Sequence, residues 1–267
     1  MAITTLDLYI AASKQNIQYL RTGARTTVAA AWYTPFDLAG APGAGTLAGT
    51  STTTGVVPTD ATAGCPTISF STGTGYLSNV DFGSSVACRV RIYDLLWKAG
   101  AYAFNASTTG QSPTSFLSRI PGGTNADTAG QTELWVEQVT TGTGTQSVAV
   151  TYNNSAGTTG RSTGTVVAPV SAAPVGRMWQ LPLQAGDTGV SGVTGVVGSV
   201  ATVGTFNILV MRKLWEGRVR IINDGDVHAL DKTGMPIVFL DSALYPIIAT
   251  DSTAIGVPEL TIEIANG

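Results

Sequence analysis

Short extended segments separated by glycine-rich turns dominate the hydrophobic pattern of residues 178–223. β-Branched and aromatic residues are frequent in these segments, and such residues fit a pleated, half-buried surface. Gly192, Gly195 and Gly198 recur in one segment, and each weakens a helix by roughly 1 kcal/mol. We therefore predict the middle of an antiparallel sheet. The predicted strands are 178–183, 190–203, 206–214 and 218–223, and the predicted turns are 185–187, 203–205 and 215–217.

Three further strands are predicted immediately before this region. In one of them Val148, Val150 and Tyr152 alternate with smaller or polar residues, so one side of the strand faces a core. The segments that link the three strands are rich in Gly, Thr and Asn, as hairpin turns are. We expect consecutive antiparallel strands that form, together with the central region, one sandwich-like unit over residues 133–223. The three strands are predicted at 134–140, 147–153 and 161–167.

One helix is predicted, from Thr5 to Leu20. Thr5 is a suitable N-terminal cap and Gly23 a suitable end, and the apolar residues between them recur near the helical period. Residues 1–22 are then a helical arm and residues 23–267 a β domain. The helix either packs on its own sheet or docks on a neighbouring subunit. Its apolar stripe consists of Leu6, Ile10, Ile17 and Leu20.

The rest of the chain predicts strands joined by two long polar segments, 37–64 and 105–130, which we expect to be ordered by a partner. In the last strand Leu260, Ile262 and Ile264 alternate with polar residues. The predicted fold is all-β, an antiparallel β-sandwich or jelly-roll-like domain with a short N-terminal helix and long ordered loops. Further strands are predicted at 26–33, 67–70, 79–80, 86–96, 99–104, 237–240, 244–249 and 259–264, with Pro236, Pro246 and Pro258 at edges or strand starts.

Charged residues are 12% of the chain, about half the usual share, whereas hydrophobic residues are 43%. Disordered chains have the opposite balance, so a folded protein is expected. The net charge of −3 and the four lysines give no electrostatic footprint for nucleic acid. No apolar run of membrane-spanning length occurs, and the first residues do not resemble a signal peptide. We therefore expect neither a nucleic acid nor a membrane as partner.

Candidate chemistry is sparse. His228 is the only histidine, and no Gly-x-Ser-x-Gly motif accompanies it, so we expect no enzyme, no catalytic residue and no cofactor. Asp224, Asp226 and His228 lie two residues apart, a spacing that could ligate a divalent metal on one strand face. Asp224-Gly225 is a turn signal and no Cys/His set or calcium-loop pattern accompanies it, so a polar hairpin tip is the favoured interpretation. No metal ligand is assigned. Cys65 and Cys88 are expected to be buried free thiols, because nothing in the sequence requires them to pair.

The aromatic residues allow two interpretations. Aligned on a surface they form a platform for carbohydrate, whereas inside strands they belong to the core. Trp135 and Trp179 lie within predicted strands and favour the core, and Trp32 and Trp97 precede flexible segments and favour an interface or the edge of the core. The full set is Trp32, Tyr33, Trp97, Trp135, Trp179 and Trp215.

Three stretches resemble virion structural proteins of tailed bacteriophages. They are RTTVAAAWYTPFDLAGAPGAGTLAGT near the start, VAVTYNNSAGTTGRST, and GRMWQLPLQAGDTGVSGVTGVVGSVATVGTFNILVMR. The resemblance is one of Gly- and Thr-rich texture over much of the chain and carries over no functional residue. The long spine helix of a tailed-phage major capsid protein has no candidate here.

This resemblance implies a capsid cement or decoration protein that bridges subunits of the head shell as a homo-oligomer. The implied partners are the major capsid protein and copies of the chain itself, and the implied location is the virion, assembled in the host cytoplasm. The arm (residues 1–22) and the segments 37–64 and 105–130 are the expected contacts. Two alternatives are a structural protein of the tail or head–tail junction and a carbohydrate-binding β-sandwich module.

Overall fold

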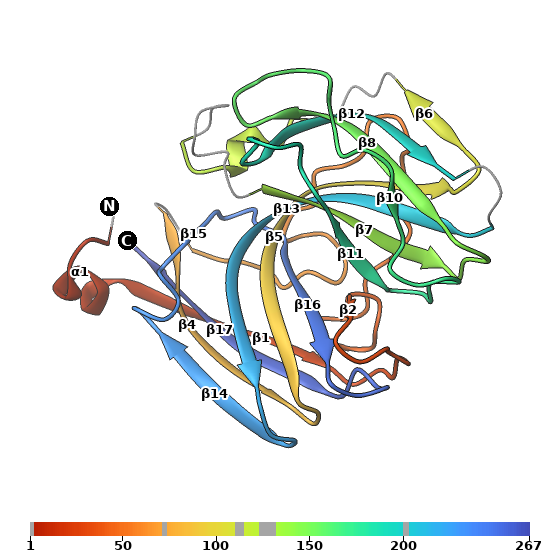
Figure 1. Ribbon diagram of the computed structural model, residues 1–267. Helices are drawn as coiled ribbons and strands as arrows, with labels where there is room; N and C mark the ends of the chain where they lie inside the picture. The colour runs from red at the N-terminus through yellow and green to blue at the C-terminus, as the bar shows by residue number, and fades with distance from the viewer. Residues whose placement is uncertain (1–2, 71–73, 110–114, 123–131, 200–202) are drawn as a thin grey trace. The chain divides into compact units, whose positions relative to one another are not determined.

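The computed structural model describes residues 3–70, 74–109, 115–122, 132–199 and 203–267, and nearly all of its regular structure is β-strand (Figure 1). The predicted all-β fold of antiparallel strands with one short N-terminal helix is confirmed. The chain forms two compact units. The first unit contains Met1–Thr46, Thr59–Asp94 and Leu214–Gly267, and the second contains Leu47–Pro58 and Leu95–Lys213.

The first unit is a sandwich of two antiparallel layers. Its larger sheet has the strand order β14-β4-β17-β1-β3, with β15 also paired to β4. In its other layer β16 lies between β2 and the start of β5, and the last residues of β13 belong to this unit. The elements are α1 (Leu6–Ala11), β1 (Ser13–Arg21), β2 (Trp32–Tyr33), β3 (Gly40–Ala41), β4 (Gly75–Ser84), β5 (Cys88–Ala103), β13 (Thr205–Val219), β14 (Asp224–Ala229), β15 (Ile237–Val238), β16 (Leu244–Thr250) and β17 (Pro258–Asn266).

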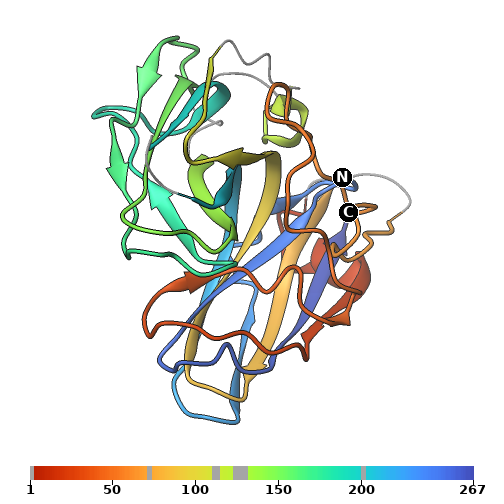
Figure 2. The same ribbon diagram turned by 90° about the vertical axis from the view of Figure 1, so that its right-hand side faces the viewer.

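Alternating side chains build the core between these layers. On β17, Leu260, Ile262 and Ile264 are buried, as predicted, because a strand turns every second residue to the same face. β1 pairs with β17 over its length, from Ser13 opposite Asn266 onward. The two ends of the chain therefore lie close together (Figure 2).

The second unit repeats this architecture with its own core. One sheet has the order β10-β8-β12-β6, with β9 also on β8, and in the other β7 lies between β11 and β13. Val148, Val150 and Tyr152 of β8 are buried, as their alternation predicted. The elements are β6 (Ser107–Thr109), the 3₁₀ helix η1 (Leu117–Arg119), β7 (Thr132–Thr140), β8 (Ser147–Asn154), β9 (Arg161–Ser162), β10 (Val166–Val167), β11 (Met178–Leu181) and β12 (Val190–Gly198).

The predicted helix from Thr5 to Leu20 is wrong beyond its first two turns. Thr5 caps the helix as predicted, but α1 ends at Ala11 and the chain continues as β1. Ile17 and Tyr19 are buried at alternate positions in that strand. Hydrogen bonding to β17 outweighs the weak helical period, since tertiary pairing overrides local propensity. The role of residues 1–22 as an arm remains a prediction. So do the predicted limits of the β domain (23–267) and of its central sandwich-like unit (133–223).

The predicted turn at 215–217 is also wrong, because β13 continues to Val219. Gly217 is buried within the strand, and a Cβ atom there would lie 2.3 Å from the Trp215 ring and 2.7 Å from Phe82. The glycine therefore makes room for two aromatic rings.

One pairing prediction and two strand predictions also fail. β7 and β8 are not a hairpin, since β7 pairs with β11 and β13 whereas β8 pairs with β9, β10 and β12. Residues 26–33 form only the bridge of Thr26 and the two residues of β2, and residues 67–70 form no strand. Pro246 lies inside β16, opposite Ile92 of β5. On the other side of β16 the short strand β2 pairs only with Ile248 and Ala249, so no backbone N–H is needed from the proline on that side.

The long segment 37–64 is held by buried side chains of the same chain. In the first unit Arg21 donates hydrogen bonds to the carbonyl oxygens of Pro42 and Gly64. In the second unit Arg119 donates to the carbonyl oxygen of Pro58, and Asn207 to that of Leu47 at 2.7 Å. These bonds fix parts of the segment within the chain, and the expected contact with a partner remains a prediction. The other long segment, 105–130, falls partly outside the described residues, and its described part contains β6 and η1.

Cys65 and Cys88 are both buried and form no disulfide, as expected. No helix in the described ranges has the length and apolar character needed to cross a membrane.

Candidate protein interaction site

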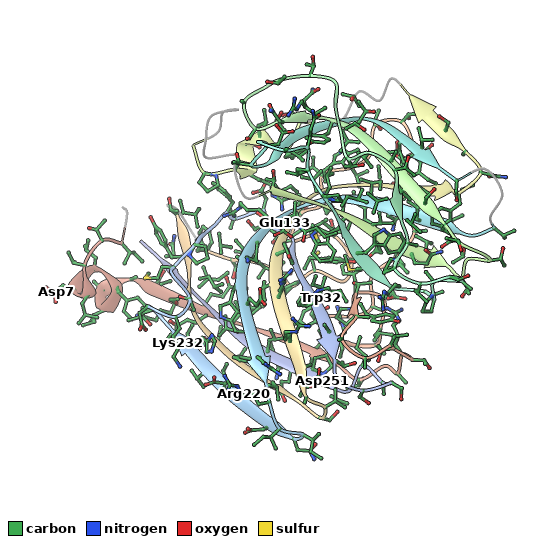
Figure 3. The ribbon with its side chains drawn as sticks, viewed as in Figure 1. Asp7, Trp32, Glu133, Arg220, Lys232 and Asp251 are labelled. Atoms are coloured by element: carbon green, nitrogen blue, oxygen red, sulfur yellow. The ribbon has the colours of Figure 1, made fainter. Side chains whose placement is uncertain are left out.

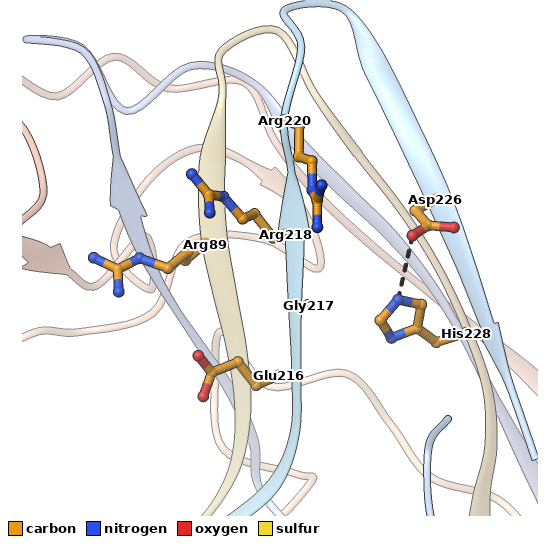
Figure 4. Close-up of a pocket in the computed structure, with 7 residues that line it drawn as sticks. All are labelled: Arg89, Glu216, Gly217, Arg218, Arg220, Asp226 and His228. Carbon is orange, nitrogen blue, oxygen red and sulfur yellow. Dashed lines mark ion pairs between the residues drawn. The ribbon is translucent and has the colours of Figure 1, made fainter. Parts of the chain in front are cut away.

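A polar hollow of about 280 Å³ opens on the first unit where β5, β13 and β14 approach one another (Figure 4). It is lined by Arg89, Glu216, Gly217, Arg218, Arg220, Asp226 and His228.

Strand alternation positions the arginines of this hollow. Arg89 stands between buried Cys88 and Val90 on β5 and is exposed. Arg218 and Arg220 stand on either side of buried Val219 and are exposed as well. Because alternate residues of a strand share a face, Arg218 points away from the core of the first unit, on the side opposite Val219. Arg220 follows the end of β13, and Figure 4 shows its side chain on the other side of the β13 ribbon from that of Arg218.

His228 is fixed in the wall of the hollow by aromatic contacts. The indole Nε1 of Trp215 donates a hydrogen bond of 3.2 Å to Nδ1 of His228, and the rings of Trp215 and Phe82 meet the imidazole edge-on. The neutral imidazole then carries its proton on Nε2, which lies 3.3 Å from a carboxylate oxygen of Asp226. The backbone N–H of Val227 and nearby cationic groups hold the pKa of Asp226 below its ordinary value.

Both carboxylates of the hollow are engaged with groups other than its three arginines. Glu216 accepts a 2.8 Å hydrogen bond from Nε of Arg91, whose guanidinium lies over the Trp32 ring at 4.5 Å from its centroid. Asp226 faces His228. Within the described part of the chain, Arg89, Arg218 and Arg220 form no ion pair. The hollow therefore presents three guanidinium groups to solvent, and guanidinium groups recognise carboxylates through paired hydrogen bonds.

The three residues of the predicted metal motif do not meet in one place. Asp226 and His228 line this hollow, whereas Asp224, which pairs opposite Ser84 at the start of β14, borders a separate hollow. No group of three or more His, Cys, Asp or Glu side chains suited to a metal ion occurs among the described residues.

The aromatic residues considered as a carbohydrate platform are mostly in the cores. Trp97, Trp135, Trp179, Trp215 and Tyr33 are buried, which leaves only half-buried Trp32 (labelled in Figure 3) beneath Arg91. The core interpretation of Trp135 and Trp179 is confirmed. Trp97, which was expected at an interface or at the edge of the core, is fully buried in a core.

Two apolar surfaces accompany the arginine hollow on the first unit. On α1, Leu6 and Ile10 are 62% and 66% exposed, and no residue of this helix is buried. Tyr9 ties the helix to β17 through a 2.8 Å hydrogen bond to Glu263, which leaves the apolar side of the helix outward. After β13, Ile221 and Ile222 are each 64% exposed in the turn that leads to β14.

Sequence reasoning identified Asp226 and His228 but missed the arginines around them. The one available signal was the alternation of Arg89 and Arg91 with apolar residues, which indicated a strand with one solvated face. Nothing in the sequence brings position 89 next to position 218, because these residues meet only through sheet formation.

Comparisons with known proteins yield weak similarities. No protein-family model matches the chain, and no curated protein matches it. Among solved structures, it is similar to VP2 of infectious bursal disease virus in a subviral particle, with 7% identity over 96% of this chain and 81% of that chain and a TM-score of 0.20. It is likewise similar to the T13 viral particle of infectious bursal disease virus, with 7% identity over 96% and 78% and a TM-score of 0.21. These are viral capsid structures, and likeness at this level carries no functional argument.

Proposed function

We propose that the chain is a virion structural protein, a capsid cement or decoration protein that binds the major capsid protein and copies of itself on the head shell. The observation that carries the proposal is the outward apolar surface of α1. Leu6 and Ile10 are i and i+4 neighbours on one side of the helix, and both are exposed to solvent. The sequence texture shared with tailed-phage virion proteins supports the same function.

A six-residue helix is too short to be stable on its own in water. α1 is held by its cap, by the Tyr9 bond to Glu263 and by Lys14, whose ammonium donates a 3.0 Å hydrogen bond to the carbonyl oxygen of Tyr9. Docking its apolar side on a neighbour removes Leu6 and Ile10 from water and adds partners that the helix lacks in the free chain. Full burial of such a side chain contributes roughly 1.5–3 kcal/mol. This gain in free energy arises only when a second protein covers the helix, as a role in bridging subunits requires.

The proposed mechanism is mechanical. Packaged genome presses outward on a shell, and a protein that binds only the assembled shell raises the free energy needed to separate its subunits. Permanent interfaces of this kind bury roughly 2,000 Å² or more. The function requires no catalytic group and no cofactor, and it places the chain in the virion after assembly in the host cytoplasm.

The test uses shells of the virus that encodes the chain, with Leu6→Ser/Ile10→Ser compared with wild type. We expect the variant to keep the wild-type unfolding temperature, because both side chains are exposed, and to lose at least about tenfold in shell affinity. Co-sedimentation with shells measures binding, and the temperature of shell disruption measures stabilisation. The matched control is Val167→Ser/Leu240→Ser, which removes two other exposed apolar side chains. Equal binding by all three proteins would overturn the role of α1.

A place in the tail or at the head–tail junction is the alternative within the same class. Density for the chain on particles separates the two, since a junction protein forms one ring per particle and a cement protein covers the shell. The carbohydrate-binding alternative lacks a surface platform among the six aromatic residues considered, because five of them are buried. Specific binding on a glycan array would restore it.

A further inference from the structure

The arginines of the hollow are exceptional within this chain. Arg89, Arg218 and Arg220 are exposed and, in the described ranges, have no ion pair. The remaining arginines are either buried or ion-paired: Arg21, Arg119, Arg177 and Arg212 are buried, and Arg25, Arg91 and Arg161 are in ion pairs. In a protein of net charge −3, the uncompensated guanidinium groups are thus gathered at one place.

The other sheet of the first unit carries a hollow of opposite charge. It has a volume of about 300 Å³ and is lined by Asp81, Phe82, Gly83, Asp224, Gly225, Glu259 and Thr261. Gly225 of β14 pairs opposite Gly83 of β4, so two neighbouring positions lack side chains and the sheet surface is depressed there. No lysine or arginine lines this hollow, and within the described part of the chain Asp81, Asp224 and Glu259 form no ion pair with a cation.

The two hollows open on opposite sides of the same sandwich. Asp81 and Glu259 neighbour the buried residues Phe82 and Leu260, so they point away from the core on the larger sheet. Arg89 and Arg218 point away from the same core on the other layer. Two surfaces on opposite sides of one body cannot pair within one molecule, but they can pair between copies.

Each charged surface also has an apolar neighbour. Ile221 and Ile222 follow Arg220 directly, and both are exposed. On the acidic side Val227, which pairs opposite Asp81, is exposed, and so is Val257, two residues before Glu259. Arginines beside exposed aliphatic side chains are typical of protein interfaces, whose buried centre is apolar and whose rim is polar.

We propose that the arginine hollow of one copy binds the acidic hollow of a second copy, so that the chains associate head to tail. This inference deepens the proposed function, because it names the surfaces for the homo-oligomer contact. Arg89, Arg218 and Arg220 face Asp81 and Glu259 of the neighbour. Such a contact uses different patches on its two sides and therefore builds rings or open arrays rather than a closed pair. Rings or arrays of this kind suit a repeating shell surface.

A nucleic acid is the less suitable occupant. The chain has a net charge of −3, which opposes the approach of a long phosphate backbone. A protein surface with separate carboxylates avoids this conflict, because each guanidinium takes one carboxylate in a fixed geometry. The acidic hollow supplies such a surface on every copy.

The test is sedimentation velocity of the purified full chain over a range of concentrations, without shells. We expect wild type to form species larger than a dimer as concentration rises, and to dissociate as salt is raised from about 0.05 M to about 0.5 M. Arg218→Gln/Arg220→Gln removes one surface and Asp81→Asn/Glu259→Gln removes the other. Each variant alone should remain a monomer.

A mixture of the two variants gives the decisive result, because each lacks a different half of the contact. The mixture should form a 1:1 heterodimer and nothing larger, since only one productive interface remains. Lys232→Gln/Asp241→Asn, which neutralises two exposed charges outside both hollows, should associate like wild type. Circular dichroism checks that all variants are folded.

Monomeric wild type at all concentrations, a mixture that stays monomeric, or association that survives in either variant would each overturn the inference. So would binding of single-stranded DNA or RNA by wild type that Arg218→Gln/Arg220→Gln abolishes. Failure of shell binding by wild type would overturn the proposed function but leave the sedimentation result intact, so the two proposals fail separately.

Discussion

At the scale of single residues, Asp187 is a carboxylate held by three side-chain donors. Its carboxylate accepts hydrogen bonds from Tyr152 at 2.6 Å, Asn154 at 2.7 Å and Arg161 at 2.9 Å, and its side chain is 2% exposed. The Arg161 bond and the other donors lower the pKa of Asp187 to about 2, against burial, which opposes the shift. The same carboxylate and burial raise the pKa of Tyr152 to about 12.

Asp187→Asn should destabilise the fold at neutral pH by about 1–3 kcal/mol, because it removes a charged acceptor and turns an amide toward the Arg161 donor. The pKa of Asp187 in the folded chain lies below the ordinary value of 3.8 that applies to the unfolded chain. The contribution is therefore complete above that value and is lost as pH falls through about 2. Thermal unfolding from pH 7 to pH 2 should show the gap between wild type and variant closing in acid.

The control for this prediction is Asp241→Asn, which changes an exposed carboxylate in a turn. Its unfolding curve should follow that of wild type at every pH. A gap for Asp187→Asn that stayed constant down to pH 2 would mean that the ionised carboxylate contributes nothing beyond its shape.

Residue-scale prediction from sequence succeeded where the partner lies nearby in the chain. Thr5 caps α1 through the N–H of Leu8, three residues on. Arg21 and Arg119 could not be predicted as buried, because their acceptors are carbonyl oxygens at least 21 residues away in sequence and as far as 43 and 61 residues away. A charged side chain is taken to be exposed unless its distant partners are known.

At the scale of elements, alternation and short apolar runs were enough to place several strands. β7, β8, β16 and β17 lie within one or two residues of their predicted limits. Their partners were not predictable, because any two amphipathic strands satisfy the same pattern. β13 was predicted as two strands because Gly217 resembles a turn residue. In the structure this glycine is needed because the rings of Trp215 and Phe82 leave no room for a Cβ atom.

Gly217→Ala tests this account of β13. The added Cβ would overlap the rings of Trp215 and Phe82, so we expect a loss of about 1–3 kcal/mol and altered tryptophan fluorescence. Gly43→Ala is the control, since nothing lies within 4 Å of its Cβ position, and should be close to neutral. A neutral Gly217→Ala would show that the strand is not packed against these rings as described.

The first elements of the chain make a second prediction at this scale. Removing residues 1–11 deletes α1, which buries nothing, and should leave the unfolding temperature almost unchanged. Removing residues 1–22 also deletes β1, which lies between β17 and β3 and buries Ile17 and Tyr19, and should abolish cooperative folding. Circular dichroism during heating compares the two truncations. Equal stability of both would show that β1 is dispensable.

At the scale of the whole molecule, the sequence predicted the fold class but only part of the candidate site. Asp226 and His228 belong to one strand, so their spacing was visible in the sequence. The arginine hollow combines residues from positions 89, 216–220 and 226–228, and the acidic hollow combines positions 81–83, 224–225 and 259–261. Both are products of strand order, which composition and periodicity do not determine.

Chain connectivity has a further consequence for stability. The two units consist of three and two chain segments, so the chain passes between them four times. Two of these passages occur inside strands, because β5 and β13 each begin in one unit and end in the other. If one unit melts, β5 and β13 lose their order over the part that lies in that unit. The other unit is then left with the frayed remainder of both strands.

We expect a single unfolding transition for both units. Far-UV circular dichroism and tryptophan fluorescence should give coincident curves, although Trp215 reports on the first unit and Trp97, Trp135 and Trp179 report on the second. Gly217→Ala in the first unit and Asp187→Asn in the second should each move the entire curve, by about 2–4 °C per kcal/mol lost. Two separate transitions, each shifted by only one of these variants, would show that the continuous strands do not couple the units.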